Sequence, residues 1–254
     1  MITLIGHGYI GTAIAQELER LGHNFAWVTH KTFIPKGMVI INAAGYTGDP
    51  NVDACEEHKE ECIQGNVLWP MELEKRCAGL PIVHVTSGCV YTGYDKQWEE
   101  TDIPNFDMSN GSFYSGCKAL TDKRFRENNK NSYLLRIRMP FGKADHPKNL
   151  LTKLKNYPRI INQFQSVSHV DDVAGAAVWF ALHKPEPGIY NCVNPKGVWT
   201  RDICNAMGWD KEYMDRDEFE YVTAAPRSEC VLSSEKMQAV YEMRTSSEAL
   251  EACL

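Results

Sequence analysis

Three glycines near the start of the chain constrain its fold more than any other feature. Gly6, Gly8 and Gly11 have the spacing GxGxxG, directly after the apolar run "ITLI" and directly before a segment with helical apolar spacing. In a dinucleotide-binding loop the first glycine permits a tight turn, the second lets the backbone approach a pyrophosphate and the third allows close helix packing. We therefore expect Gly6, Gly8, Tyr9, Ile10 and Gly11 to bind a cofactor. A tight strand-to-helix turn without a ligand is the alternative.

Strand and helix patterns alternate along most of the chain. Apolar, β-branched runs predict strands at 2–5, 24–28, 38–45, 81–87, 132–139 and 188–193. Apolar residues at helical spacing predict helices after the glycine loop and over 53–78, 112–129 and 170–183. This alternation predicts an α/β, Rossmann-like fold, a doubly wound parallel sheet with helices on both faces. Between Val28 and Met38 the chain is too short for a crossover helix, so we expect a bare loop there.

Charge and cysteine content exclude several classes of protein. The net charge is -6, and no block of Lys or Arg forms the basic footprint that nucleic-acid binding needs. No window of about 18 apolar residues and no export signal occurs, so we expect a cytoplasmic protein with no membrane partner. The nine cysteines are odd in number and include no CxxC or zinc-ligand spacing. Reduced thiols and no metal site are therefore expected.

The end of the second predicted strand indicates which dinucleotide binds. NAD sites usually place Asp or Glu here, where the carboxylate holds the ribose 2′-hydroxyl. Thr29, His30 and Lys31 instead offer hydroxyl and cationic groups, which suit a 2′-phosphate. We expect NADPH rather than NADH; a solvated loop with a chance lysine is the alternative. The residues that end the third predicted strand are expected to pack beside the same cofactor: Asn42, Ala43, Ala44 and Gly45.

The segment "FYSGCK" places a tyrosine and a lysine on one face of a predicted helix. Tyr114 and Lys118 are one helical turn apart, so their side chains can meet. A tyrosine is a poor acid-base group at neutral pH until a nearby ammonium favours its phenolate. An upstream strand ends in Ser87, a third group suited to the same site. The alternative is a surface tyrosine and lysine on an amphipathic helix.

Longer segments carry a family resemblance. They are "NAAGYTGDPNVDACEEHK" at 42–59, "IPNF" at 103–106, "GSFYSGCK" at 111–118, "LRIRMP" at 135–140, "NLLTKL" at 149–154, "GIYNCVNP" at 188–195 and "APRSE" at 225–229. In these segments the chain resembles the extended short-chain dehydrogenases/reductases, and among them the nucleotide-rhamnose epimerase-reductases, relatives of dTDP-4-dehydrorhamnose reductase. It departs from them in the missing helix after Thr29 and in a GxGxxG that is one residue shorter than their GxxGxxG.

The resemblance implies a division of the chain and a reductase site. One unit, 1–254, would comprise an NADP-binding core, mainly 1–142 and 169–193, and a small substrate-binding lobe, mainly 143–168 and 194–254. Ser87, Tyr114 and Lys118 would form the reductase triad. In that triad the serine holds a ketone oxygen, the tyrosine protonates it, and the lysine holds the ribose and lowers the pKa of the tyrosine.

The resemblance also implies a second activity. Cys89 and Lys153 match the positions of a 3,5-epimerase pair, which would remove and return protons that a 4-keto group acidifies. A small buried cysteine and a solvated helix lysine are the alternatives. Arg227 resembles a residue that faces a nucleotide diphosphate, with a surface salt bridge as its alternative. Further implied substrate-binding residues are Gly88 and Asn149.

Three functions remain open from the sequence. The first is a bifunctional epimerase-reductase that uses NADPH to convert a UDP- or dTDP-linked 4-keto-6-deoxyglucose to the rhamnose. The second is a reductase only, and the third is a non-catalytic NADP-binding regulatory subunit. Cys89 and Lys153 argue against the second, and the intact Ser87, Tyr114 and Lys118 argue against the third. The family often pairs through the helix that carries Tyr114, so we expect a homodimer.

Overall fold

The apolar runs that predict strands form one parallel sheet. The computed structural model describes residues 1–29, 38–128 and 131–254. Within these residues the sheet has six strands in the order β10-β5-β4-β3-β1-β2. They are β1 Ile2–Ile5, β2 Phe25–Val28, β3 Val39–Asn42, β4 Ile82–Ser87, β5 Tyr133–Ile137 and β10 Gly188–Asn191. The doubly wound α/β fold expected from the sequence is confirmed.

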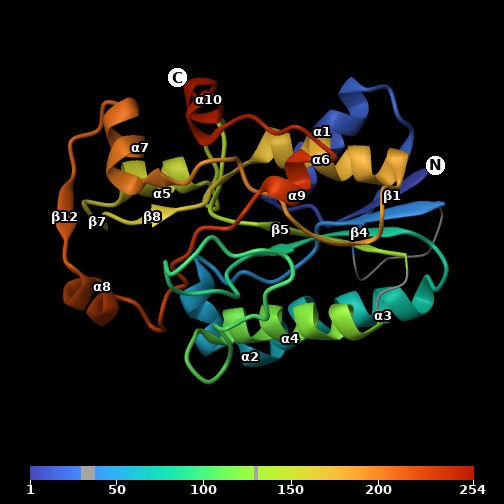
Figure 1. Cartoon of the computed structure of the whole chain (residues 1–254), viewed down its shortest axis with the longest axis horizontal. Helices are drawn as coiled ribbons and strands as arrows, with labels where there is room; N and C mark the ends of the chain where they lie inside the picture. Colours follow the sequence, from blue (N-terminus) through green and yellow to red (C-terminus); the bar gives the residue numbers. More distant parts are fainter. Residues whose placement is uncertain (30–37, 129–130) are drawn as a thin grey trace.

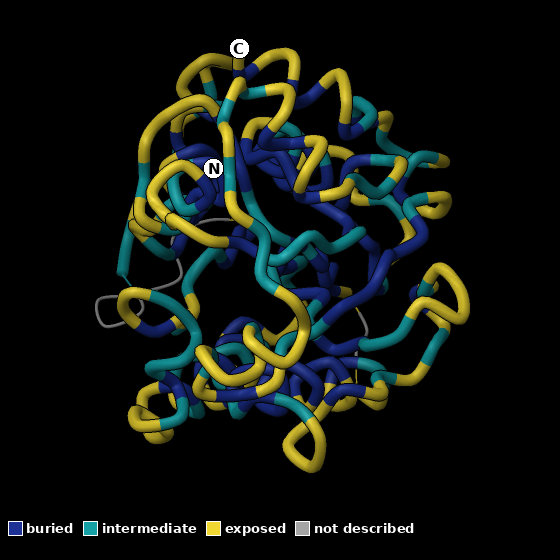
Figure 2. The backbone as a smooth tube through the Cα atoms, turned by 90° about the vertical axis from the view of Figure 1, so that its left-hand side faces the viewer, coloured by how far each residue is buried: buried dark blue, intermediate teal, exposed yellow. Residues whose placement is uncertain are grey.

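Helices cover both faces of the sheet. In Figure 1, α1 (Tyr9–Arg20) and α6 (Val170–His183) lie above it, and α2 (Lys59–Ile63), α3 (Trp69–Arg76) and α4 (Phe113–Asn128) lie below it. The largest apolar core fills the space between the sheet and the α1–α6 pair. Figure 2 shows buried backbone through the middle of the molecule and exposed segments around it. Burial on both faces explains why the strands read as continuous apolar runs.

The predicted helix over 53–78 is divided at 57–58 into two parts. These are the short helix η1 (Val52–Glu56) and a continuous helical stretch, 59–76, made of α2, the π-helical segment η2 (Gln64–Leu68) and α3. The π-helical segment lies where η2 comes close to Tyr46: a Cβ on Gly65 would lie 3.0 Å from the Cβ of Tyr46. The Asn66 amide also donates to the Tyr46 carbonyl at 2.8 Å and accepts from its N–H at 3.2 Å.

β2 forms the edge of the sheet because the next strand pairs elsewhere. Phe25 lies beside Ile2 on one side of β1, and Val39 of β3 lies beside Ile2 on the other side. Within the described residues no strand pairs with the outer side of β2. The bare loop expected between Val28 and Met38 falls on residues 30–37, which lie outside the described residues.

A second apolar core lies at the other end of the molecule. It is built around α5 (Leu150–Asn156), α7 (Thr200–Ala206) and α10 (Ser246–Glu251). Short strands accompany them: β6 Pro140–Phe141, β7 Arg159–Ile161, β8 Phe164–Gln165, β9 Ser168–His169, β11 Val198–Trp199 and β12 Glu212–Met214. They pair as β6-β9, β11-β8 and β12-β7. The helix α8 (Arg216–Val222) lies at the outer edge of this region in Figure 1.

A part of the segment 194–254, which was expected to lie mainly in the substrate lobe, packs on the main core. Helix α9 (Glu235–Gln238) follows α8 in the chain and lies beside β10. Met237 and Met243 are buried in the same cluster as the strands and α6. The chain therefore returns to the sheet before it ends in α10. Apolar side chains in the region that follows α8 explain this return, because the outer strand β10 needs cover.

Candidate active site

The glycine loop between β1 and α1 has little space for side chains at two of its three glycines. Gly6 has φ +103°, and a Cβ there would lie 2.7 Å from the Ala44 nitrogen. A Cβ on Gly11 would lie 2.1 Å from the Gly6 carbonyl oxygen, whereas nothing lies within 4 Å of one on Gly8. Gly8 also begins α1 without a side-chain cap. The N-terminus of α1 is therefore accessible to a ligand at Gly8. Its free N–H groups and open space suit a pyrophosphate.

A cavity beside this loop collects residues from three strand ends. Its volume is about 370 Å³, and it is lined by Gly6, His7, Gly8, Thr29, Ala43, Ala44 and Gly45. The expected positions Thr29 and 43–45 therefore do lie beside the glycine loop. His7 was not singled out from the sequence, because it occupies a variable position of GxGxxG. His30 and Lys31 lie outside the described residues.

Other residues expected at the cofactor have protein partners. The Asn42 amide contacts the Nδ1 of His84 at 3.1 Å and accepts from the indole N–H of Trp69 at 3.2 Å, so its side chain braces the sheet. Ile10 packs against the main core. Tyr9 stacks on His146 with ring centroids 4.5 Å apart, and its hydroxyl has no hydrogen-bond partner among the described residues. His146 thereby connects the glycine loop to the chain before α5.

Ser87, Tyr114 and Lys118 lie together close to the cavity lining. The Ser87 hydroxyl interacts with that of Tyr114, and the Lys118 Nζ lies 5.6 Å from the centre of the tyrosine ring. A Cβ on Gly45 would lie only 3.6 Å from the Lys118 Nζ, which places the ammonium beside the cavity lining. Tyr114 and Lys118 are both buried. The predicted helix spacing and the strand end have thus brought three polar groups to one place.

Burial sets the protonation of this group. It raises the pKa of Tyr114, with Cys89 adding to the rise and the Ser87 hydroxyl opposing it. Burial lowers the pKa of Lys118 to about 8. In the protein alone the pKa of Tyr114 is thus raised, because the loss of hydration on burial outweighs the hydrogen bond from Ser87. Tyr114 is therefore a protonated donor at neutral pH.

Cys89 stands directly beside the triad serine. Its backbone N–H donates to the Ser87 hydroxyl at 3.0 Å, and its sulfur accepts from the Nη1 of Arg138 at 3.4 Å. Of the nine cysteines Cys89 alone is partly exposed; the other eight are buried. Gly88 leaves room for this arrangement, since a Cβ there would lie 2.5 Å from a methyl carbon of Leu232.

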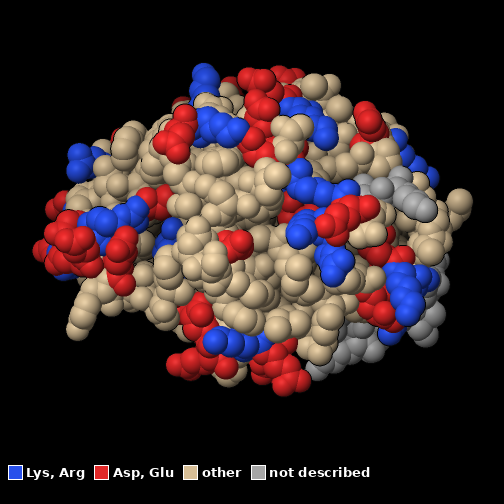
Figure 3. Space-filling view, turned by 60° about the horizontal axis from the view of Figure 1, so that its bottom comes forward, with Lys and Arg blue, Asp and Glu red and all other residues tan. Residues whose placement is uncertain are grey.

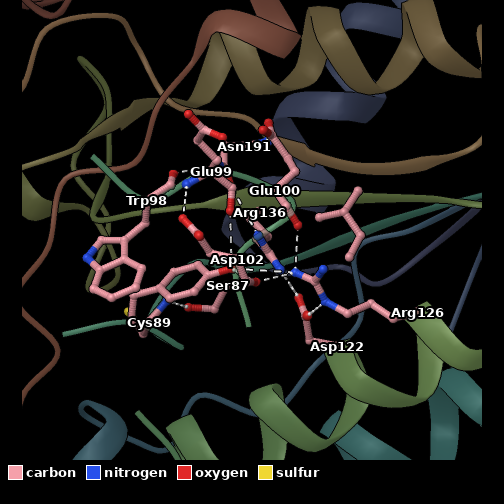
Figure 4. A network of polar contacts seen from close by, with 12 residues as sticks. Ser87, Cys89, Trp98, Glu99, Glu100, Asp102, Asp122, Arg126, Arg136 and Asn191 are labelled. Atoms are coloured by element: carbon pink, nitrogen blue, oxygen red, sulfur yellow. Dashed lines mark hydrogen bonds and ion pairs between the residues drawn. The ribbon is translucent and has the colours of Figure 1, made fainter. Parts of the chain in front are cut away.

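A buried ionic network fixes the helix that carries Tyr114 and Lys118. Arg136 of β5 donates through Nε to Asp122 of α4 at 2.8 Å, and Arg126 donates to the same carboxylate at 2.8 Å (Figure 4). Arg126 also donates to the Glu100 carbonyl at 2.7 Å. Sequence reasoning missed Asp122; an acid eight residues after Tyr114 on an otherwise buried helix face was the available signal.

The remaining predicted residues lie around α5. Asn149 caps this helix and donates to the carbonyl oxygens of Gly142 and Ala144 at 2.7 and 2.8 Å, so its amide is occupied by the backbone. Burial lowers the pKa of Lys153, and the charges of Lys148 and Arg227 lower it further. No hydrogen bond or ion pair joins Lys153 to Cys89 within the described residues.

Comparison with known proteins identifies the family. The model of the RmlD substrate binding domain matches residues 7–254. The chain belongs to this family. A bifunctional dTDP-4-dehydrorhamnose 3,5-epimerase/dTDP-4-dehydrorhamnose reductase of Arabidopsis thaliana is 32% identical over 232 residues, which cover 83% of this chain and 74% of the relative. The chain spans only 31% of a trifunctional Arabidopsis dehydratase/epimerase/reductase, to which it is 32% identical.

Solved structures of RmlD-like proteins share the fold. The UDP-rhamnose synthase L780 of Acanthamoeba polyphaga mimivirus superposes with a TM-score of 0.89 at 23% identity, over 100% of this chain and 99% of that one. The dTDP-4-dehydrorhamnose reductase of Bacillus anthracis, solved with NADP, has a TM-score of 0.81 at 17% identity, over 98% and 96% of the two chains. The expected relationship to dTDP-4-dehydrorhamnose reductase is confirmed by the family model and the Arabidopsis relative. Within the described residues no helix is long and apolar enough to cross a membrane.

Proposed function

We propose that this protein is an NADPH-dependent 4-ketoreductase with 3,5-epimerase activity, which converts a UDP- or dTDP-linked 4-keto-6-deoxyglucose to the L-rhamnose nucleotide. One observation carries the proposal. Ser87, Tyr114 and Lys118 lie together, with Lys118 beside Gly45 of the glycine-loop cavity, and the Cys89 N–H donates to that same serine. A reductase site and a proton-transfer group therefore share one ketone position. The family membership supports the same chemistry.

The glycine loop and the cavity fit the dinucleotide. The open side of Gly8 and the uncapped start of α1 would hold the pyrophosphate, and Lys118 would reach the nicotinamide ribose past Gly45. Thr29, His30 and Lys31 would hold the 2′-phosphate. When bound, NADPH supplies the hydride for the reduction.

Reduction needs a proton donor at the C4 oxygen of the sugar. The Ser87 hydroxyl donates a hydrogen bond to that oxygen, and Tyr114 gives it a proton. The raised pKa of Tyr114 keeps this donor protonated at neutral pH. The low pKa of Lys118, about 8, lets the lysine return a proton to the tyrosine without a large barrier.

Epimerisation needs two groups on opposite faces of the sugar ring. The 4-keto group acidifies the protons on C3 and C5; removal of one leaves an enolate, and a proton returns to the other face. Cys89 and Lys153 form this pair, while the Ser87 and Tyr114 hydroxyls stabilise the enolate oxygen. The lowered pKa of Lys153 suits a group that must exist partly as the free amine.

The substrate lobe, 143–168 with 194–254, takes the nucleotide. Arg227 lies in the segment that joins α8 to the core, and Lys148 and Lys153 lie near enough for their charges to act on one another. This group of cations suits a diphosphate. Gly88 lines the sugar position, and Asn149 acts by fixing the start of α5.

A reductase without epimerase activity is the second candidate. The observation that favours it is that Cys89 already has protein contacts: its N–H donates to Ser87, and its sulfur accepts from Arg138. Under this function, Cys89 would be a packing residue beside Ser87. The substrate would then reach the protein already epimerised.

One experiment separates these functions. Purified protein is incubated with NADPH and either UDP- or dTDP-4-keto-6-deoxyglucose, and the products are resolved by NMR. The proposal expects the L-rhamnose nucleotide from one or both substrates. Conversion only of the pre-epimerised keto sugar supports the reductase alone, and no NADPH oxidation with any of these sugars contradicts both functions.

We further propose a homodimer through the helical layer below the sheet. Exposed apolar side chains lie on it: Leu68 of η2, Met71 of α3 and Leu120 of α4. Figure 3, in which the lower side comes forward, shows a broad region with few charges between scattered acidic and basic groups. Light scattering after size exclusion should give twice the chain mass, and Leu120→Glu should reduce it. A monomeric unmodified protein contradicts the proposal.

A further inference from the structure

Arg138 is a buried arginine next to the proposed acid-base cysteine. It follows β5 directly, and only 1% of it is exposed. Its Nη1 donates to the Ser228 hydroxyl at 2.6 Å and to the Cys89 sulfur at 3.4 Å, and its Nη2 donates to the Ser228 carbonyl at 3.2 Å. Its Nε is buried and has no hydrogen-bond partner among the described residues. All of the acceptors named here are uncharged when Cys89 is a thiol.

Arg136, two residues earlier, shows what a neutralised arginine looks like in this protein. It is buried to the same degree, but it donates through Nε and Nη2 to the Asp122 carboxylate at 2.8 and 2.5 Å. Arg138 forms no ion pair with any carboxylate of the described residues. A buried charge without a counter-ion is costly, so its retention calls for an anion that forms during function. The sulfur of Cys89 is the acidic group in direct contact with it.

We propose that Arg138 is the positioning residue for Cys89 in the epimerisation, holding the sulfur at the triad and balancing its negative charge whenever the cysteine has given up its proton. This inference rests on the proposed epimerase function. In the step concerned, the proton passes from sulfur to the sugar carbon, the enolate electron pair forms the new C–H bond, and Arg138 stays protonated throughout. A neighbouring guanidinium favours the thiolate form of a cysteine.

Other ionisable groups face this position and are part of the electrostatic balance. Tyr114 and Lys118 approach Cys89 from α4, and Cys230 and Tyr94 lie near Arg138. Burial opposes the charge on Arg138, yet Cys230, Cys89 and Tyr94 raise its pKa, so the guanidinium stays charged. Cys230 is buried and its pKa is raised by burial, which leaves it a thiol.

Alkylation tests the inference without any catalysis. Cys89 is the only partly exposed cysteine, so iodoacetamide labelling can be followed at its peptide by mass spectrometry. Arg138→Met should slow labelling at pH 7 by about tenfold and move the increase of the labelling rate with pH to higher pH. Arg138→Lys should retain most of the labelling rate. Ser228→Ala, which keeps the cation beside the sulfur, should change the rate by less than about threefold. Equal rate-pH profiles for Arg138→Met and the unmodified protein overturn the inference.

Kinetics then connect Arg138 to one reaction. Arg138→Met should cut deuterium exchange at C3 or C5 of the keto sugar by about tenfold or more, and NADPH oxidation on a pre-epimerised sugar should fall much less. Adding Cys89→Ala to Arg138→Met should cost nothing beyond Cys89→Ala alone. Undiminished exchange in Arg138→Met overturns the role. If the unmodified protein exchanges no deuterium, the proposed epimerase function fails, and the alkylation result still decides whether Arg138 acts on Cys89.

Discussion

Arg227 donates to the carboxylate of Asp53 at 2.5 Å, and this ion pair joins the C-terminal segment to the short helix η1. The other oxygen of the same carboxylate accepts from the Ala224 N–H at 3.1 Å. The guanidinium proposed to hold the nucleotide diphosphate is thus already held by an acid, which orients it. In the proposed complex, Asp53 and the diphosphate would therefore share one cation.

If Arg227 holds the diphosphate, its replacement should weaken binding of the nucleotide sugar. Arg227→Met should raise KM for the nucleotide sugar by about 10- to 100-fold, the range for losing a hydrogen bond to a charged group, and change kcat little. Steady-state kinetics with varied nucleotide sugar measure both constants. Asp53→Asn is the matched control, since it frees the guanidinium and should not weaken substrate binding. An unchanged KM in Arg227→Met would assign the residue to a structural ion pair.

Loss of the Tyr114 hydroxyl should stop reduction and spare cofactor binding. Tyr114→Phe should lower the rate of NADPH oxidation by about 10²- to 10⁴-fold, the usual effect of losing a general acid. Fluorescence titration should give an NADPH affinity close to that of the unmodified protein, because the ring still fills its buried site. Full turnover in this variant would show that another group protonates the ketone.

The cofactor preference should follow the positive charge after β2. We expect NADPH to bind more tightly than NADH, and Lys31→Asp to narrow or invert that preference, because a carboxylate repels the 2′-phosphate and accepts from a 2′-hydroxyl. Titrations with both cofactors measure the ratio. Thr29→Ala serves as a milder comparison that removes a hydroxyl without changing charge. Equal affinities in the unmodified protein would rule out the predicted selectivity.

The proposed epimerase pair predicts that the two reactions separate. Cys89→Ala or Lys153→Ala should suppress deuterium incorporation at C3 or C5, because each variant lacks one of the two proton-transfer groups. Ser87, Tyr114 and Lys118 remain, so NADPH oxidation on a pre-epimerised sugar should persist, with some loss in Cys89→Ala from packing beside Ser87. NMR follows the exchange. Exchange at the unmodified rate in Cys89→Ala would leave a reductase only.

Lys118 should destabilise the folded protein when no cofactor is bound. Its pKa is about 8 in the folded chain against an ordinary 10.5, which corresponds to roughly 3 kcal/mol. Below pH 8 the folded chain bears the whole cost of the buried charge. Between pH 8 and 10.5 the folded chain loses the proton while the unfolded chain keeps it, so stability rises with pH.

The lowered pKa of Lys118 predicts a measurable difference in Tm between the unmodified protein and a Lys118→Met variant. Lys118→Met should raise Tm at pH 7 while abolishing NADPH oxidation, and its advantage in Tm should shrink as the pH rises from 8 to 10. Thermal unfolding without cofactor at several pH values gives the comparison. A Tm advantage that does not change with pH would point to better packing by methionine rather than to relief of a buried charge.

The sequence by itself determined the features that depend on near neighbours in the chain. The glycine loop, the strands and the one-turn spacing of Tyr114 and Lys118 follow from local periodicity and from the space that glycine leaves. A regular helix was predicted over 53–78, and its π-helical segment η2 was missed because Tyr46, which contacts Asn66 of η2, lies 20 residues away in the chain.

Only the tertiary structure decided which groups meet and in which state of protonation. Arg227 pairs with an acid 174 residues away, and Arg138 meets a sulfur 49 residues away. The residues near Arg227 and Arg138 in the sequence do not indicate either partner, because any acid or thiol in the chain could have occupied these positions. Burial likewise decided that the pKa of Tyr114 rises and that of Lys118 falls. A motif gives the residue types, but hydration and partners exist only once distant segments have packed together.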